Sequence, residues 1–192
     1  MQNTLKISPS RRSSVIVVDD FYEDPFSIRS SALQLTFYRD ENFFHGQRTR
    51  ERFATPVLRE AFSTIIGQNI VRWDEHAMNG VFQICMATDP IVYHADAQRW
   101  AAMIFLTPDA PLGAGTSFFQ HRETNALDMR NADPKQIFSG GFFDGTKFRL
   151  ADQVANVFNR LVIFDARRIH AASGYFGSAD SDARLFQMFF FD

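Results

Sequence analysis

From residue 79 to residue 106 the chain reads NGVFQICMATDPIVYHADAQRWAAMIFL. Short apolar segments alternate here with turn residues such as Asn79-Gly80 and Asp89-Pro90, and this punctuation is typical of a β-sandwich or a β-barrel. The same pattern continues through the rest of the chain. We expect strands at 81–87, 91–94, 100–106, 116–119, 161–164 and 184–191. The sequence therefore predicts a mainly β fold, which 22 phenylalanines favour because aromatic side chains suit pleated, half-buried surfaces.

The residues before position 79 predict one strand and two helices that flank the β region. The apolar run at 15–18 has the length of a strand. Asp24-Pro25 resembles a helix N-cap followed by proline in the first turn, and a second helix is expected over 56–66, closed by Gly67. The first helix would bury a stripe made of Phe26, Ile28, Ala32, Leu33 and Leu35.

Two polar segments, 39–55 and 122–153, are interpreted as loops. The second is long for a loop inside one domain, and such loops usually form lids or binding surfaces. We expect it to pass over the mouth of the barrel. The 192 residues fit a single domain, with a helical support region at 1–78 and the β core at 79–192.

Composition excludes several classes of function. Twenty Lys and Arg balance 22 Asp and Glu without a basic block, so nucleic acid is not expected as a partner. Cys85 is the only cysteine, which excludes an internal disulfide and a cysteine-based zinc site. No signal peptide and no long apolar stretch is evident, so we expect a cytoplasmic protein without a membrane partner. The sequence carries no prediction of oligomeric state.

One group of residues has the composition of a metal site. His94-Ala95-Asp96 stands at the end of a predicted strand, where side chains at positions i and i+2 point to the same face. His170 follows another predicted strand and could supply a second nitrogen from the far side of a barrel. Two histidines and one carboxylate on one face of a metal leave three positions open, an arrangement suited to non-haem Fe(II) oxygenases. Arg184 begins the last predicted strand.

This order of residues resembles the 2-oxoglutarate-dependent Fe(II) oxygenase superfamily, in which His-x-Asp, a distal His and a following Arg lie on a double-stranded β-helix. The resemblance covers roughly residues 79–192. It rests on Tyr93-His94-Ala95-Asp96 and on the segments 99–106, 111–116, 161–173 and 184–186. It implies a jelly-roll, cupin-like core with N-terminal helices.

The resemblance also implies roles for these residues. His94, Asp96 and His170 would hold Fe(II), with 2-oxoglutarate and O2 at the open positions. Arg184 would bind the remote carboxylate of 2-oxoglutarate through two parallel charge-assisted hydrogen bonds. The expected reaction is hydroxylation of a C–H bond with release of succinate and CO2. Asp96 favours this outcome, because halogenating members of the superfamily usually replace the carboxylate by a small residue.

Further contacts to 2-oxoglutarate are assigned to Tyr93, Thr116 or Gln83, because the chain departs from the family pattern. The glycine turn reads Gly-Ala-Gly at 113–115, and Phe186 stands where a Ser is frequent. A Tyr is often found on the strand before the metal ligands, where this chain has Gln83, Cys85 and Met86.

Other residues are weighed as parts of a substrate pocket. Phe186 would point inward if Arg184 does, together with Met188 and Phe190. Arg168 is a candidate contact for an anionic substrate.

The segment His121-Arg122-Glu123 is a second His-x-acid match, which we interpret as a pair at the pocket rim or on the surface. His45 and His76 lie among charged residues and are expected to be solvated.

Two other functions remain open from the sequence. A cupin-like metal enzyme that does not use 2-oxoglutarate would need the same ligands and be indifferent to Arg184. A non-catalytic jelly-roll binding module would need neither the metal ligands nor Arg184. The substrate of the oxygenase would be a small molecule or a peptide.

Overall fold

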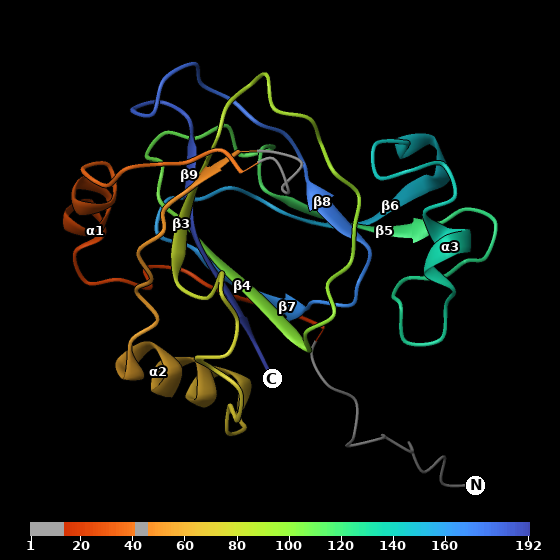
Figure 1. Cartoon of the computed structure of the whole chain (residues 1–192), viewed down its shortest axis with the longest axis horizontal. Coiled ribbons are helices and arrows are strands. Elements are labelled where there is room, and N and C mark those ends of the chain that lie inside the picture. The colour runs from red at the N-terminus through yellow and green to blue at the C-terminus, as the bar shows by residue number, and fades with distance from the viewer. Residues whose placement is uncertain (1–13, 41–45) are drawn as a thin grey trace, which may run out of the picture.

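Two antiparallel β-sheets form the centre of the computed structural model, which describes residues 14–40 and 46–192 (Figure 1). The major sheet has the strand order β1-β7-β4-β9-β3-β2 and the minor sheet the order β6-β5-β8. The strands of the major sheet are β1 (Val15–Val18), β2 (Gln47–Arg48), β3 (Val81–Cys85), β4 (Trp100–Phe105), β7 (Leu161–Asp165) and β9 (Arg184–Phe191). Those of the minor sheet are β5 (Thr116–His121), β6 (Phe148–Val154) and β8 (His170–Ala172).

From β4 onward the chain passes back and forth between the sheets. β4, β7 and β9 belong to the major sheet, whereas β5, β6 and β8, which lie between them in the sequence, belong to the minor sheet. This connectivity is that of a double-stranded β-helix, as the sequence predicts. Its consequence for function is that residues from β8 and β9 can face one another across the space between the sheets.

Both faces of the major sheet are covered. The outer face packs against helices α1 (Pro25–Ala32) and α2 (Pro56–Ile66), which lie at the opposite side of Figure 1 from β5 and β6. On the inner face, Phe105 and Phe164 of the major sheet share one apolar cluster with Phe118 of the minor sheet. A strand buried on both sides has apolar residues at consecutive positions, and this explains the triple phenylalanine at the end of β9.

Helix α2 has the predicted bounds. Thr55 caps it by accepting a hydrogen bond from the Leu58 amide at 3.3 Å, and Gly67 ends it in the left-handed conformation at φ 68°. Phe62 is fully buried and its ring lies 5.0 Å from the ring of Phe189 on β9. The helix thereby fixes the outer face of the strand whose inner face carries Arg184.

The structure of helix α1 corrects part of the buried stripe that the sequence predicts for it. It begins at Pro25 after the Asp24 cap, and Ala32 is buried as expected. Phe26, however, is 60% exposed and contacts Phe158 rather than the core. The helix ends before Leu33, which continues in a turn and packs against the core together with Leu35.

Three loop or strand predictions are also corrected. Residues 91–94 form no strand, and only His94 makes an isolated bridge, to His170. The predicted excursion at 122–153 contains α3 (Pro134–Ile137), a 3-10 turn (Gly145–Lys147) and most of β6. The predicted loop at 39–55 contains β2, while its residues 41–45 lie outside the described part. The other predicted strands are confirmed to within two residues at their ends. None of the helices in the described ranges is long and apolar enough to span a membrane.

Candidate metal centre

His94, Asp96 and His170 converge at one point between the sheets. Each offers one ligand atom, and the three atoms lie within 4.8 Å of one another. The two imidazole rings are 4.3 Å apart between centroids, and His170 Nε2 lies 3.5 Å from Asp96 Oδ2. Donor atoms that share one metal ion at bond lengths of about 2.0–2.2 Å lie roughly 3–4 Å apart. The three side chains therefore enclose a space of the size of a metal site.

Backbone hydrogen bonds bring these residues together. The amide of His94 donates to the His170 carbonyl at 3.0 Å, and the amide of His170 donates to the His94 carbonyl at 2.8 Å. The Asp96 amide donates to the Ala166 carbonyl at 2.8 Å. This pairing replaces the predicted strand and still places His94 and Asp96 on the same side.

The hydrogen bonds of the imidazoles direct both Nε2 atoms toward the centre. His94 Nδ1 lies 3.0 Å from the Val92 carbonyl oxygen, and His170 Nδ1 lies 2.8 Å from the Arg168 carbonyl oxygen. A carbonyl oxygen only accepts, so each Nδ1 carries the proton and each neutral ring keeps a lone pair on Nε2. This tautomer is the one that a metal bound at Nε2 requires.

Burial disfavours the charged forms of two of the three residues. Burial raises the pKa of the Asp96 carboxyl, against a smaller opposing effect of His94. Burial also lowers the pKa of His170 well below its usual value, and the neighbouring His94 adds to this. Burial thus disfavours the anionic form of Asp96, which a divalent cation beside it would favour. The donor set fits a metal ion.

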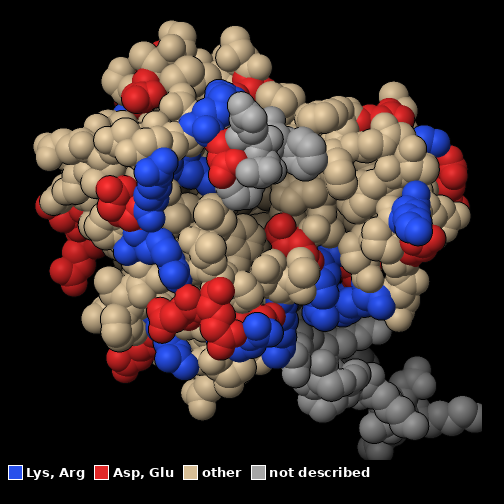
Figure 2. Space-filling view, in the orientation of Figure 1, with Lys and Arg blue, Asp and Glu red and all other residues tan. Residues whose placement is uncertain are grey.

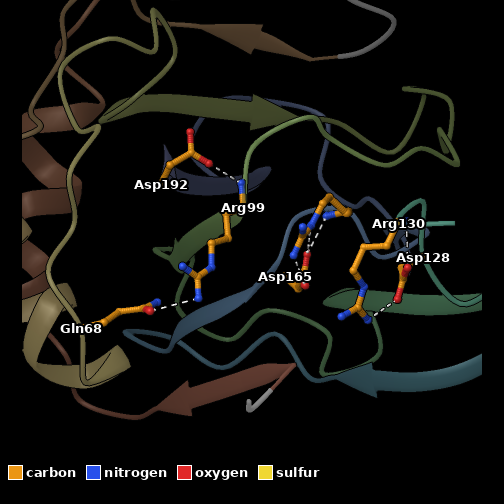
Figure 3. Close-up of polar contacts among 7 residues, drawn as sticks. Gln68, Arg99, Asp128, Arg130, Asp165 and Asp192 are labelled. Atoms are coloured by element: carbon orange, nitrogen blue, oxygen red, sulfur yellow. Dashed lines mark hydrogen bonds and ion pairs between the residues drawn. The ribbon is translucent and has the colours of Figure 1, made fainter. Parts of the chain in front are cut away.

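Polar contacts anchor the two segments that carry the ligands (Figure 3). The Arg99 amide donates to Asp192 Oδ1 at 2.7 Å, and its guanidinium donates to Gln68 Oε1 at 3.0 Å. In the turn before His170, Arg167 binds both carboxylate oxygens of Asp165 at 2.8 Å. These contacts restrain the loop after Asp96 and the turn before His170.

The centre opens into a cavity of about 510 Å³ between the sheets. Arg184, Phe186, Met188 and Phe190 all line it, so alternate residues of β9 point inward as the sequence predicts. Figure 2 shows neutral side chains at the middle of one face of the molecule and charged side chains gathered around them. The volume lies within the roughly 300–1,000 Å³ that is common for small-molecule sites.

Arg184 lies in this cavity and is 2% exposed. Its Nε donates to the Ala114 carbonyl at 3.0 Å, and Nη2 donates to the Gly115 carbonyl at 3.2 Å. Gly115 also allows the close approach of the backbone at the end of β6, because a Cβ there would lie 1.9 Å from the Val154 carbonyl oxygen. In the described ranges Arg184 has no acidic partner, so a buried positive charge stands beside the cavity.

The residues predicted to make further contacts to 2-oxoglutarate lie in two different places. Gln83 and Thr116 line the cavity, and the Thr116 hydroxyl donates to Met103 Sδ at 3.1 Å. Tyr93 is not among the residues that line the cavity, and it stacks on Phe148 with ring centroids 5.2 Å apart, so its cofactor contact stays a prediction. Its neighbours Val92 and His94 both line the cavity.

Of the residues predicted for the substrate pocket, only some lie in the cavity. Phe186 lines the cavity, whereas Arg168 and His121 do not. Arg168 pairs with Asp152 and covers the ring of Phe118 at 4.3 Å. His121 is fully buried against Phe148, with ring centroids 5.7 Å apart, so its predicted position at the rim or surface is wrong.

Sequence reasoning missed several cavity residues, among them His76, Tyr175 and Arg48. His76 was expected in solvent, but it lines the cavity, with Nε2 3.5 Å from Asp192 Oδ2. Tyr175 lies with its ring centroid 5.6 Å from the Arg184 guanidinium, and burial raises its pKa well above its usual value. Arg48 belongs to a charged run that reads as a loop. The turn that carries Tyr175 has no strand pattern, so no periodicity in the sequence indicates where the Tyr175 side chain points. His45 lies outside the described residues.

The fold is similar to that of known 2-oxoglutarate oxygenases. HygX from Streptomyces hygroscopicus, solved with nickel, 2-oxoglutarate and hygromycin B bound, has a TM-score of 0.62 and 10% identity over 92% of this chain and 82% of its own. AviO1 from Streptomyces viridochromogenes Tue57 has a TM-score of 0.54 and 11% identity, covering 95% and 91%. An oxidoreductase of the 2OG-Fe(II) oxygenase family from Burkholderia pseudomallei has a TM-score of 0.56 and 8% identity, covering 93% and 84%.

These likenesses confirm the double-stranded β-helix, and at such low identity they carry the fold alone. A search of curated proteins finds no match to the sequence. One family model matches residues 2–174, which is most of the chain. The chain belongs to this family, which is described as a family of unknown function, DUF6445.

Proposed function

We propose that this protein is an Fe(II)- and 2-oxoglutarate-dependent oxygenase that hydroxylates a C–H bond of a small molecule or of a peptide side chain. The observation that carries the proposal is the presence of two imidazoles, a carboxylate and a buried guanidinium around one cavity. The likeness of the fold to that of HygX, which was solved with nickel and 2-oxoglutarate, supports it.

His94, Asp96 and His170 would hold the metal through two Nε2 atoms and one carboxylate oxygen. This donor set suits Fe(II) and leaves positions open on the opposite face. When bound, Fe(II) and 2-oxoglutarate supply the oxidation of a C–H bond by O2, with release of succinate and CO2. The carbonyls of Val92 and Arg168 hold the two imidazoles in the orientation that ligation needs.

Arg184 would bind the carboxylate of 2-oxoglutarate that is remote from the metal. The Ala114 and Gly115 carbonyls fix the guanidinium, and the Phe186 ring lies 4.5 Å from it. A guanidinium has five N–H groups, so two bonds to carbonyls leave donors for a carboxylate. Because Arg184 is buried without an acidic partner in the described ranges, an anionic ligand would also compensate its charge.

The walls of the cavity would keep water from the reaction. Ala101, Met103 and Phe164 contribute apolar surface next to the ligand residues. Such surface excludes water, and it strengthens the electrostatic contacts made inside the site. Asp96 retains the carboxylate expected of a hydroxylating centre.

The test is to measure succinate with purified protein, Fe(II), 2-oxoglutarate and O2, together with 2-oxoglutarate affinity of the Mn(II)-loaded protein. We expect succinate to form only when both Fe(II) and 2-oxoglutarate are added. Arg184→Gln should lower 2-oxoglutarate affinity by about 100-fold or more, because it removes two charge-assisted hydrogen bonds, while Mn(II) affinity is retained.

Arg149→Gln, an exposed change on β6, is the matched control and should keep wild-type affinity. Iron-dependent oxidation that needs no 2-oxoglutarate and is unchanged in Arg184→Gln would instead favour a cupin-like metal enzyme. Absence of metal binding to the wild-type protein would favour a binding module.

A further inference from the structure

The guanidinium of Arg184 is held by two carbonyl groups of the turn at residues 111–115. Its Nε donates to the Ala114 carbonyl at 3.0 Å, and its Nη2 donates to the Gly115 carbonyl at 3.2 Å. Ala114 and Gly115 are buried, whereas the other residues of this turn are exposed. The direction of the guanidinium therefore depends on how firmly a turn at the surface is held.

Each of these two carbonyls accepts a second hydrogen bond from another part of the chain. The backbone amide of Ser173 donates to the Gly115 carbonyl at 3.0 Å. Asn156, which lies between β6 and β7, donates through Nδ2 to the Ala114 carbonyl at 3.2 Å. A carbonyl oxygen has two lone pairs, so each of these oxygens uses both of them. Two further donors thus set the direction of the acceptors that hold Arg184.

Only one of these two further donors is a side chain. Ser173 donates through its backbone, as any residue except proline could. The backbone amide of Asn156 likewise donates to the Leu112 carbonyl at 3.0 Å, which restrains the turn whatever the side chain is. The bond to the Ala114 carbonyl, by contrast, requires the side-chain amide of Asn156.

The stability of the fold does not explain this buried amide well. Asn156 is 1% exposed, and its Oδ1 is buried without a hydrogen-bond partner among the residues that the structure describes. A buried polar atom without a partner is destabilising, and this offsets the gain from the bond at Nδ2. The one bond that the side chain makes goes to the carbonyl that also holds Arg184.

We propose that Asn156 is a positioning residue for the binding of 2-oxoglutarate. Its amide holds the Ala114 carbonyl, and this carbonyl holds the Arg184 guanidinium in the direction that the remote carboxylate needs. Asn156 is not among the residues that line the cavity, so its effect passes through Arg184. A donor that is ordered before the ligand arrives lowers the cost of binding. The role rests on the proposed function, because it acts on the contact between Arg184 and 2-oxoglutarate.

The test is titration calorimetry on the Mn(II)-loaded protein without oxygen. The two probes are 2-oxoglutarate and 2-oxopentanoate, which has the same carbon chain without the remote carboxylate. Asn156→Ala should lower 2-oxoglutarate affinity by about 10-fold, because the charge-assisted bonds from a less ordered Arg184 are weaker. The affinities for 2-oxopentanoate and for Mn(II) should stay within about twofold of wild type, because neither ligand needs the guanidinium.

Gln153→Ala is the matched control. Gln153 is exposed, and its Nε2 donates to the Gly113 carbonyl of the same turn at 3.2 Å. This change removes an amide bond of the same kind from a carbonyl that does not hold Arg184, so 2-oxoglutarate affinity should stay within about twofold of wild type.

A double-mutant cycle checks that the effect passes through Arg184. In the Arg184→Gln protein, Asn156→Ala should change 2-oxoglutarate affinity by less than about twofold, because the guanidinium that it positions is already absent.

Thermal unfolding separates a positioning role from a structural one. Asn156→Ala should keep the midpoint within about 4 °C of wild type, because it removes an unsatisfied oxygen together with one hydrogen bond. Asn156→Ser is a second variant, whose hydroxyl is one bond closer to the backbone than the amide nitrogen. It should lower 2-oxoglutarate affinity to a similar degree.

The positioning role is overturned if Asn156→Ala binds 2-oxoglutarate as tightly as wild type, or if Gln153→Ala weakens binding as much. It is also overturned if affinity for 2-oxopentanoate or Mn(II) falls in parallel, or if both Asn156 variants fail to fold. Failure of the proposed function looks different. The wild-type protein would then not bind 2-oxoglutarate, or Arg184→Gln would bind it unchanged, and the role of Asn156 would fall with it.

Discussion

Two segments of this chain share the pattern His-x-acid, and the structure uses them differently. In the first, His94 and Asp96 both line the cavity, where they meet His170. In the second, His121 is fully buried and Glu123 is exposed, paired with Lys147 at 3.0 Å. The pattern alone thus does not bring its two side chains to one site. A metal site needs in addition a third donor that another strand brings to the same point.

The two segments also differ in the tautomer of the histidine. His121 Nδ1 accepts a hydrogen bond from the Thr124 amide at 3.3 Å, so the neutral ring carries its proton on Nε2. In His94 and His170 the proton is on Nδ1, because carbonyl oxygens face it. His121 therefore closes the turn that follows β5, whereas the other two histidines leave Nε2 with a lone pair that suits metal binding.

The largest expected effect is on metal affinity. His170→Ala should lower the affinity for Mn(II), measured under anaerobic conditions, by more than about 100-fold, because it removes one of three protein donors. His121→Ala should keep wild-type affinity, since its ring lies in a different cluster. The reverse result would mean that the metal lies at the second segment.

The fold could be predicted where strands bury apolar residues on a face. β3, β4 and β9 are rich in such residues, and their bounds agree with the predicted ones to within two positions. β6 was missed because five of its seven residues are exposed, so its sequence reads as a polar loop. β2 has two residues, too few for any period to show.

The candidate site could be predicted in part, for the same reason. Arg184 stands on a strand whose alternation sets its direction, and the structure places it inside the cavity as expected. Tyr93 adjoins His94, and for a strand the same rule predicts that the two side chains point to opposite sides. Arg48 and Tyr175 could not be found, because they reach the cavity through pairings between distant segments that no local pattern carries.

A smaller effect is expected on the free energy of unfolding. Here the change at His121 should matter more than the change at His94, which is the reverse of their order for metal affinity. His121→Ala should lower the free energy of unfolding of the metal-free protein by about 1–3 kcal/mol, because it empties a fully buried position and leaves the Thr124 amide without its acceptor. His94→Ala should cost less than about 1 kcal/mol, since His94 is half-buried and already borders a cavity. Urea unfolding of both variants tests this, and equal losses would remove the distinction between a structural and a ligating histidine.

The smallest effect, on thermal stability and on Mn(II) affinity, is expected from Glu123, the acidic residue of the second segment. The hydrogen bond from Lys147 lowers the pKa of the exposed Glu123 carboxyl, so any stabilisation by this pair is present near neutral pH and is lost as the pH falls through the titration of that carboxyl. Solvent and salt screen such a pair, and Glu123→Gln should therefore change neither the thermal midpoint nor Mn(II) affinity measurably. Asp96→Asn, the same chemical change in the first segment, should abolish Mn(II) binding because the carboxylate is the anionic donor. If the two variants lost metal to a similar degree, Glu123 would have to reach the centre from the far side of β5, and the separation of the two segments on which the proposed oxygenase depends would not hold.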